Sequence, residues 1–94
     1  MLHRMNYDWD AAKAVRNLRK HGVTFEEAGS VFGDPLACTF PDPDHSIGES
    51  RFLTFGMSIN QRILVVCHIE HTHGIRIISA REATAHERKI WQDE

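Results

Sequence analysis

The sequence predicts an α+β fold, made of two N-terminal helices, an antiparallel sheet of three to four strands and a C-terminal helix. Apolar residues recur at helical spacing in the first third of the chain and alternate with polar residues between Ser50 and Glu70. A capping pattern, Ser79 followed by Glu82, then opens a last helical stretch. Because the chain has 94 residues, we expect residues 1–94 to form one domain.

Two helices are expected in the N-terminal third of the chain. Asp8 or Asp10 is placed to cap the first helix, and Gly22 is expected to end it in a left-handed conformation. Thr24 and Glu27 form a capping box for the second helix, which a Gly-Asp-Pro sequence ends. The apolar residues at helical spacing are Ala11, Ala12, Ala14, Val15 and Leu18 in the first helix and Phe25, Ala28, Val31 and Phe32 in the second.

Strands are expected in the rest of the chain. Residues 36–40 suit a short edge strand, and residues 50–57 and 62–70 alternate their side chains as half-buried strands do. Residues 71–74 form a hairpin turn, and residues 75–78 form an isoleucine-rich strand that leads directly into the final helix. We therefore expect one face of the sheet to pack on the helices and the other to be partly open.

The composition limits the classes of protein to which this chain can belong. Charged residues make up 26% of the chain and hydrophobic residues 41%, which is ordinary for a globular domain and argues against disorder. The formal net charge is −2, so any contact with nucleic acid must come from a local basic patch. No stretch resembles a signal peptide or a membrane span, which predicts a cytoplasmic protein with Cys38 and Cys67 as free thiols.

Short sequence pieces between Tyr7 and Trp91 together resemble the BrnT toxins of bacterial type II toxin–antitoxin modules. No single piece is diagnostic, but they occur in one order with compact spacing. They are Trp9-Asp10, Lys13, Asn17-Leu18, Lys20-His21-Gly22-Val23, Phe25-Glu26-Glu27-Ala28, Val31-Phe32, Asp34-Pro35, His45, Glu49-Ser50-Arg51, Gly56-Met57-Ser58, Arg62-Ile63-Leu64-Val65-Val66, Arg76-Ile77-Ile78-Ser79-Ala80-Arg81, Ala83 and Glu87-Arg88.

The resemblance implies a small RelE-like ribonuclease that cleaves RNA, inhibits translation and needs no cofactor. It also implies a BrnA-type antitoxin as the partner, in a heterotetramer built on an antitoxin dimer, with operator DNA bound only through the antitoxin. One departure stands out, because members of the family often carry an arginine shortly after the third strand, where this chain has His71. A catalytically inactive homologue that binds the antitoxin as a co-repressor is therefore the alternative function.

Cleavage of RNA without a metal needs a base, an acid and cations around the crowded phosphate. Arginine suits the last of these roles, because its guanidinium matches the geometry of a phosphate. With the resemblance, this gives the catalytic candidates Lys20, His21, Glu49, Arg51 and Arg81. From residue type alone, an ion pair with Glu82 or Glu87 explains Arg81 better. A salt bridge to Arg51 similarly explains Glu49, and the helix dipole already favours cations at Lys20 and His21.

The same reasoning gives the substrate-binding candidates Trp9, Arg62, Arg76, His68 and His71. Trp9 suits stacking on a base, although a tryptophan before an amphipathic helix more often belongs to the core. Arg62 and Arg76 suit a phosphate contact or a solvated face equally. The nuclease hypothesis requires that these arginines, with Arg51 and Arg81, converge on one hollow.

Three histidines near the predicted hairpin raise a metal site as a further alternative, because imidazole is a common zinc ligand. They are His68, His71 and His73. Side chains alternate along a strand, so His68 and His71 should point to opposite faces of the sheet. We therefore expect no metal site.

Overall fold

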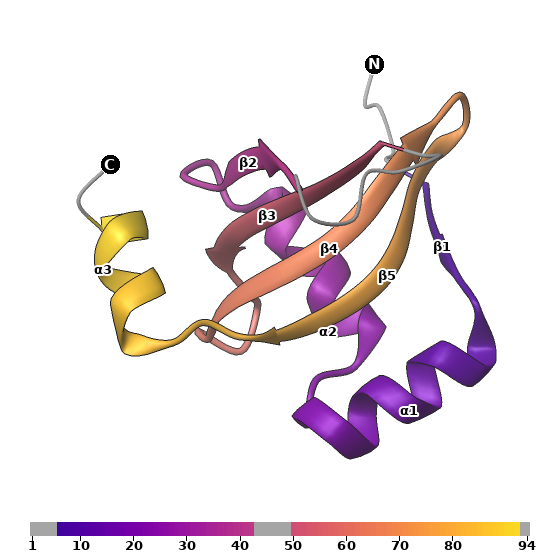
Figure 1. The fold of residues 1–94 in the computed structure, drawn as a ribbon, viewed down its shortest axis with the longest axis horizontal. Helices are drawn as coiled ribbons and strands as arrows, with labels where there is room; N and C mark the ends of the chain where they lie inside the picture. Colours follow the sequence, from indigo (N-terminus) through magenta and orange to yellow (C-terminus); the bar gives the residue numbers. More distant parts are fainter. Residues whose placement is uncertain (1–5, 43–49, 93–94) are drawn as a thin grey trace.

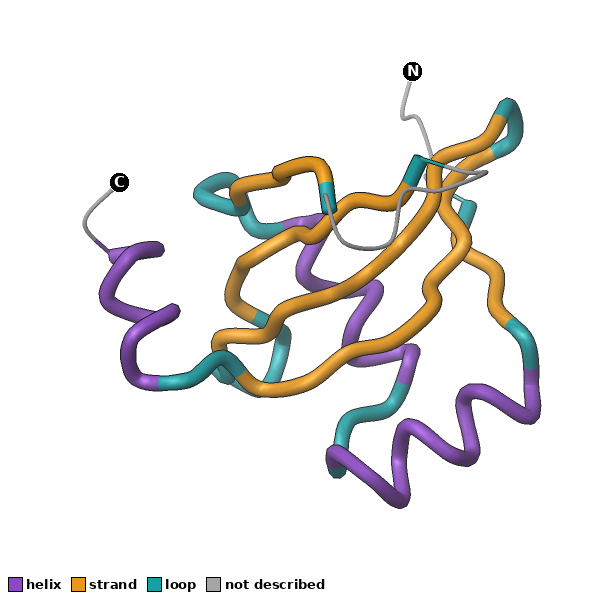
Figure 2. The backbone as a smooth tube through the Cα atoms, in the orientation of Figure 1, coloured by secondary structure: helices purple, strands orange, loops and turns teal. Residues whose placement is uncertain are grey.

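The computed structural model describes residues 6–42 and 50–92 of the chain. Figure 1 shows how the elements are arranged, and Figure 2 shows the same view by type of secondary structure. The elements are β1 (Tyr7–Trp9), α1 (Ala11–His21), α2 (Phe25–Ser30), the 3-10 helix η1 (Val31–Gly33), β2 (Cys38–Pro41), β3 (Arg51–Met57), β4 (Ile63–His71), β5 (Gly74–Glu82) and α3 (Ala85–Gln92).

The strands form one five-stranded sheet in the order β1-β5-β4-β3-β2. Neighbouring strands from β2 to β5 are antiparallel, whereas β1 is parallel to β5. The α+β class is therefore confirmed, with the helices and the meander in the predicted order. The prediction of three to four strands was wrong, because it missed β1, which precedes both N-terminal helices.

The backbone of β1 comes very close to the start of β5. Gly74 has a φ of 142°, and a Cβ added there would lie 2.1 Å from the carbonyl oxygen of Asn6. A side chain at residue 74 would therefore clash with the backbone that leads into β1, and glycine also accepts this φ without strain. Glycine at the hairpin is thus what allows the parallel edge strand to pair.

The ends of α1 and the start of α2 follow the predicted caps. Asp10 accepts a 2.9 Å hydrogen bond from the backbone N–H of Lys13, and Gly22 ends α1 with a φ of 69°. Thr24 accepts a 3.0 Å bond from the backbone N–H of Glu27. The capping box of α2 is only half formed, because the Glu27 carboxylate binds other partners.

The predicted start of the last helix was wrong. Ser79 lies inside β5, opposite Cys67 of β4, and the ladder to β4 continues as far as Glu82. The capping box that forms is Thr84 with Glu87: Thr84 accepts from the Glu87 N–H at 3.1 Å, and Glu87 accepts from the Thr84 N–H at 2.9 Å. Backbone pairing along a long neighbouring strand therefore overrides the local capping signal at Ser79.

The two faces of the sheet have different surroundings. The covered face packs on α2, which Figure 1 shows behind the strands, and the open face is the opposite one. The core on the covered face consists of Val23, Phe25, Ala28, Val31, Leu64, Val66, Ile75, Ile77 and Ala80. Among the described elements, α3 stands over the open face, where a pocket of about 290 Å³ separates Ile90 and Trp91 from Phe40 and Phe55. For the described residues, this agrees with the prediction of a partly open sheet.

Candidate functional site

Three of the four arginines that were expected to converge lie on the open face, each pairing through β4. Arg51 of β3 and Arg76 of β5 both pair with Ile69, so they flank it in one row. Neighbouring strands are about 4.8 Å apart, which separates the Cα atoms of this row by about 10 Å. Arg81 pairs with Val65, about 13 Å further along β4. The three arginines share a face but not a single small hollow, so the predicted convergence of the four arginines was wrong. A site for RNA cleavage must therefore draw on other cations beside this face.

Arg62 lies elsewhere, and its prediction as a substrate ligand is corrected. Its guanidinium binds both carboxylate oxygens of Glu27, with Nε donating at 2.9 Å, and also donates to the Gly22 carbonyl at 3.1 Å. Ser58 donates to the same carboxylate at 2.6 Å. These bonds, led by that to Arg62, lower the pKa of the buried Glu27 to about 2. Arg62 therefore joins α2 to the turn between β3 and β4 and is not available to a substrate.

A β-bulge in β5 shapes the edge of the sheet next to α1. Cys67 pairs with Ser79 and His68 pairs with Ile77, so Ile78 is an extra residue in β5. A bulge re-aims the side chains around it. Ile78 and Ser79, although adjacent in sequence, both line a shallow pocket of about 350 Å³ against α1.

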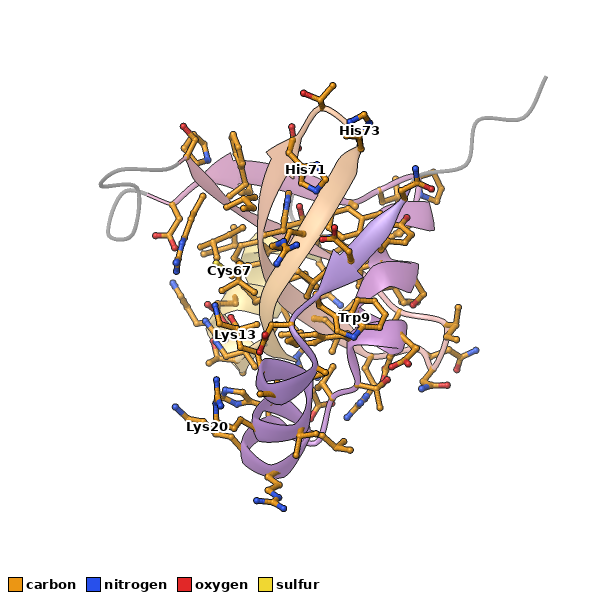
Figure 3. The ribbon with its side chains drawn as sticks, turned by 90° about the vertical axis from the view of Figure 1, so that its right-hand side faces the viewer. Trp9, Lys13, Lys20, Cys67, His71 and His73 are labelled. Carbon is orange, nitrogen blue, oxygen red and sulfur yellow. The ribbon has the colours of Figure 1, made fainter. Side chains whose placement is uncertain are left out.

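The α1 side of this pocket is basic. It consists of Lys13, Arg16, Asn17, Lys20 and His21. Among the described residues, no acidic side chain lines the pocket. Figure 3 shows Lys13 and Lys20 on the same side of the molecule as Cys67 of the open face, whereas Trp9 points to the other side. Of the predicted catalytic residues, Lys20 and His21 thus meet here, at the border of the open face.

Arg81 is bound by α3. Its two terminal nitrogens donate to the two carboxylate oxygens of Glu87 at 2.7 and 3.0 Å. This pairing lowers the pKa of Glu87 to about 2. The ion pair that residue type alone favoured for Arg81 is therefore present. Because the carboxylate of Glu87 binds both terminal nitrogens, a phosphate that uses the same pair of donors must displace Glu87.

Arg76 and His71 share an acidic partner near the hairpin. The Asp8 carboxylate lies 3.2 Å from Nε of Arg76 and 3.7 Å from Nε2 of His71. All three side chains are well exposed, so the contacts are of the kind that contribute little to stability. These two predicted substrate ligands are brought together, at the end of the sheet furthest from Arg81.

His68 is fully buried on the covered face, and its prediction as a substrate ligand is corrected. Its Nε2 lies 2.7 Å from the Thr54 hydroxyl, and its ring contacts Phe32 edge-on and stacks on Phe52. Burial lowers its pKa to about 4. The imidazole is therefore a neutral part of the core at pH 7, on the face opposite His71 as strand alternation predicted.

Trp9 also packs on the covered side. Its ring meets Phe25 edge-on, with the ring centroids 5.8 Å apart, and it is partly buried against the core. This is the core position that was the alternative to base stacking. Glu49, the predicted base, lies outside the described residues.

Residues 6–42 and 50–92 contain no group of three or more histidine, cysteine, aspartate or glutamate side chains placed to hold a metal ion. Within the same residues, no helix has the length and apolar character that a membrane crossing requires.

Comparison with known proteins identifies the family. The family profile described as "Ribonuclease toxin, BrnT, of type II toxin-antitoxin system" matches residues 9–87. The chain belongs to the BrnT family. A search of curated proteins gives no match. The fold matches the 1.1 Å crystal structure of the Brucella abortus ribonuclease toxin BrnT, with a TM-score of 0.67 and 24% identity over 86% of this chain and 99% of that one. Membership of a type II toxin–antitoxin family implies an antitoxin partner for this BrnT chain.

Two cations of this pocket, Lys13 and Arg16, were not among the site residues predicted from the sequence. Lys13 and Arg16 line it with Lys20, and their spacing along α1 already places them near one face of the helix. That signal was available in the sequence. The positions of Ile78 and Ser79 were not, because the bulge depends on the pairing of β5 with β4.

Proposed function

We propose that this BrnT chain is a metal-independent endoribonuclease that cleaves RNA and so inhibits translation in the cytoplasm, with a RelE-like use of cations. The observation that carries the proposal is the basic pocket between α1 and the bulge of β5, which opens beside the arginine-bearing face of the sheet. Phosphate contacts from several cations suit the phosphate backbone of RNA, and the family's description as a ribonuclease toxin supports the assignment.

The geometry supports a division of roles. Lys13, Arg16 and Lys20 would hold the backbone and neutralise the charge that develops on the scissile phosphate. His21 lines the same pocket, and histidine is the side chain that most often transfers protons in catalysis, so it is our candidate for proton transfer. Arg81 would add a bidentate phosphate contact once Glu87 is displaced.

We further propose that a BrnA-type antitoxin neutralises the toxin by covering this face, in a heterotetramer built on an antitoxin dimer. The open face supports the proposal because it combines cations with the partly exposed Phe40, Phe55 and Ile90. An acidic, amphipathic segment of the antitoxin would complement both features. Operator DNA would then be bound through the antitoxin alone.

Expression without an antitoxin tests the proposal. Wild-type protein should arrest growth, and the purified protein should cleave single-stranded RNA equally well with and without a chelator. Arg81→Ala should reduce cleavage about 100-fold, the scale for loss of one charge-stabilising donor. Arg88→Ala on the exposed part of α3 removes the same charge as a control and should leave cleavage unchanged. Intact RNA and normal growth with the wild-type protein would refute the assignment.

One observation favours the alternative, a catalytically inactive homologue that acts as an antitoxin-binding co-repressor. Of the four arginines expected at the site, Arg62 is committed to Glu27 and Arg81 is paired with Glu87. In that case purified protein would bind the antitoxin and strengthen operator binding but would leave RNA intact. The cleavage assay with antitoxin-free protein separates the two functions.

A further inference from the structure

Asn17 of α1 is a buried polar residue to which the proposed chemistry assigns no role. Only 6% of its surface is exposed, although it lies on the helix that carries the basic side chains of the pocket. A buried primary amide is costly unless its donors and acceptor are satisfied. The hydrogen bonds of Asn17 therefore indicate what this residue holds in place.

All of its described bonds are to backbone groups. The side-chain N–H groups donate to the Ala80 carbonyl at 2.8 Å and to the Val23 carbonyl at 3.0 Å. The side-chain oxygen accepts from the Ala80 N–H at 3.0 Å. Asn17 thus binds both the N–H and the C=O of one strand residue, as the backbone of a neighbouring strand would.

The place of this contact along β5 explains why such a substitute is needed. The edge strand β1 pairs only with Ile75 to Ile77, so its ladder ends before Ala80. The bulge at Ile78 lies between the two segments. Asn17 therefore continues the pairing of the β5 edge where β1 no longer reaches, and in doing so it attaches α1 to the strand just beyond the bulge.

The contact between Asn17 and Ala80 also sets the position of the basic side chains that line the pocket. Lys13 precedes Asn17 by one helical turn and Lys20 follows it by nearly one turn, and both line the pocket with Ser79. Side chains at these spacings lie on one face of a helix. The amide that holds α1 to Ala80 is therefore the point about which Lys13 and Lys20 are placed.

We propose that Asn17 is a positioning residue of the ribonuclease: its amide acts as a substitute strand that holds Lys13 and Lys20 of α1 over the β5 bulge in the orientation that binds RNA. The inference rests on the proposed ribonuclease function and adds to it a residue whose amide is engaged by backbone groups of the protein itself. Asn17 acts only through the basic side chains on either side of it.

A double-mutant cycle with Lys20→Gln tests the proposal. Asn17→Asp keeps the size and the acceptor of the side chain but places a carboxylate oxygen next to the carbonyl oxygens of Val23 and Ala80, which repel it. Asn17→Ala removes every hydrogen bond of the side chain. We expect each to weaken binding of single-stranded RNA about tenfold. The magnitude of the slope of log affinity against log salt should fall by about 0.7 for one lost phosphate contact or about 1.4 for two, because each contact on single strands contributes about 0.7. Added to Asn17→Ala, Lys20→Gln should cost little more, since the two substitutions remove the same contact.

A stability control separates positioning from general loss of structure. Val31→Ala opens a cavity in the buried core at η1, away from α1, and should lower the melting temperature to a similar extent. We expect it to leave the salt slope and the effect of Lys20→Gln as in the wild type. Equal losses of affinity in Val31→Ala, or additive losses in the Asn17 and Lys20 double variant, would overturn the inference.

Hydrogen exchange provides a readout that does not depend on RNA. In Asn17→Ala the amide of Ala80 and those of residues 14–21 in α1 should exchange at least tenfold faster than in Val31→Ala. If the wild-type protein fails to bind RNA but this difference is present, the proposed function fails while the role of Asn17 in holding α1 stands. Unchanged exchange at Ala80 would refute that role directly.

Discussion

The Glu27–Arg62 and Glu87–Arg81 pairs have the same chemistry but lie on opposite faces of the sheet. In each, a guanidinium binds both oxygens of a carboxylate and lowers the pKa of the glutamate to about 2. The surroundings differ, because the side chain of Glu27 is 5% exposed and that of Glu87 is 22% exposed, while Arg62 is 29% and Arg81 is 40% exposed.

The difference in exposure between the two pairs indicates which arginine stabilises the fold. Glu27–Arg62 joins elements 35 residues apart and also engages Ser58 and the Gly22 carbonyl, so several elements depend on it. Glu87–Arg81 spans 6 residues and joins β5 only to the short α3. We infer that the covered face uses arginine to stabilise the fold, whereas the open face holds arginine in a contact that a substrate can replace.

The largest expected effect on stability is at the covered face. Arg62→Ala leaves the carboxylate of Glu27 buried without its cation, which should lower the free energy of unfolding by about 3 kcal/mol. Urea denaturation at pH 7 measures this loss. Arg81→Ala should cost less than about 1 kcal/mol in the same assay, because the pair is partly exposed. Similar losses for the two variants would remove the distinction between the faces.

A pH titration of stability gives the next largest effect. His68 has a pKa of about 4 in the folded protein, below its ordinary value of 6.5, because burial disfavours the cation. The unfolded chain therefore binds more protons between pH 6.5 and pH 4, and stability falls on acidification through that window, by up to about 3 kcal/mol. Below pH 4.5, protonation of Glu27 and Glu87 removes further stability.

His68→Leu tests the origin of the slope between pH 6.5 and pH 4.5. The variant should unfold with nearly constant free energy across that window, as measured by urea denaturation at several pH values. His73→Gln at the exposed hairpin is the matched control and should keep the wild-type slope. A slope that survives His68→Leu would show that another group titrates on folding.

The capping signals show which parts of the local structure could be predicted from the sequence alone. Asp10, Gly22 and Thr24 act locally, within a few residues; Gly22 and Thr24 were predicted correctly, and Asp10 was one of the two candidates for its cap. Ser79 and Glu82 carry the same kind of signal, yet they form strand, because pairing with β4 decides the local structure there. A local signal is thus reliable only where no long-range partner competes for the backbone.

The candidate site was harder to predict than the fold for the same reason. The basic side of α1 follows from helical spacing, but the pocket also needs the bulge at Ile78, which arises from the register of two strands. Arg62 and Arg76 looked equivalent in sequence. Their different roles follow from which face of the sheet each one meets, and for Arg62 from the buried Glu27 contributed by α2.

A smaller effect is expected at α3. Glu87→Gln removes the charge that competes for Arg81, so affinity for single-stranded RNA should rise about threefold, while stability falls by less than about 1 kcal/mol. Fluorescence anisotropy with a labelled RNA measures the change. Glu82→Gln, on the same corner but without a hydrogen bond from its carboxylate to Arg81, serves as the control. An unchanged or lower affinity in Glu87→Gln would show that Arg81 does not meet the RNA.

The most direct test of the central claim compares two cations on one helix. Lys20 lines the pocket at the β5 bulge, whereas Arg19, the preceding residue of α1, does not. In single-turnover cleavage of RNA by purified, antitoxin-free protein, Lys20→Gln should be at least about 100-fold slower than wild type and Arg19→Gln within about twofold of it. Equal rates for the two variants would contradict the claim that the pocket beside the open face is where RNA is cleaved.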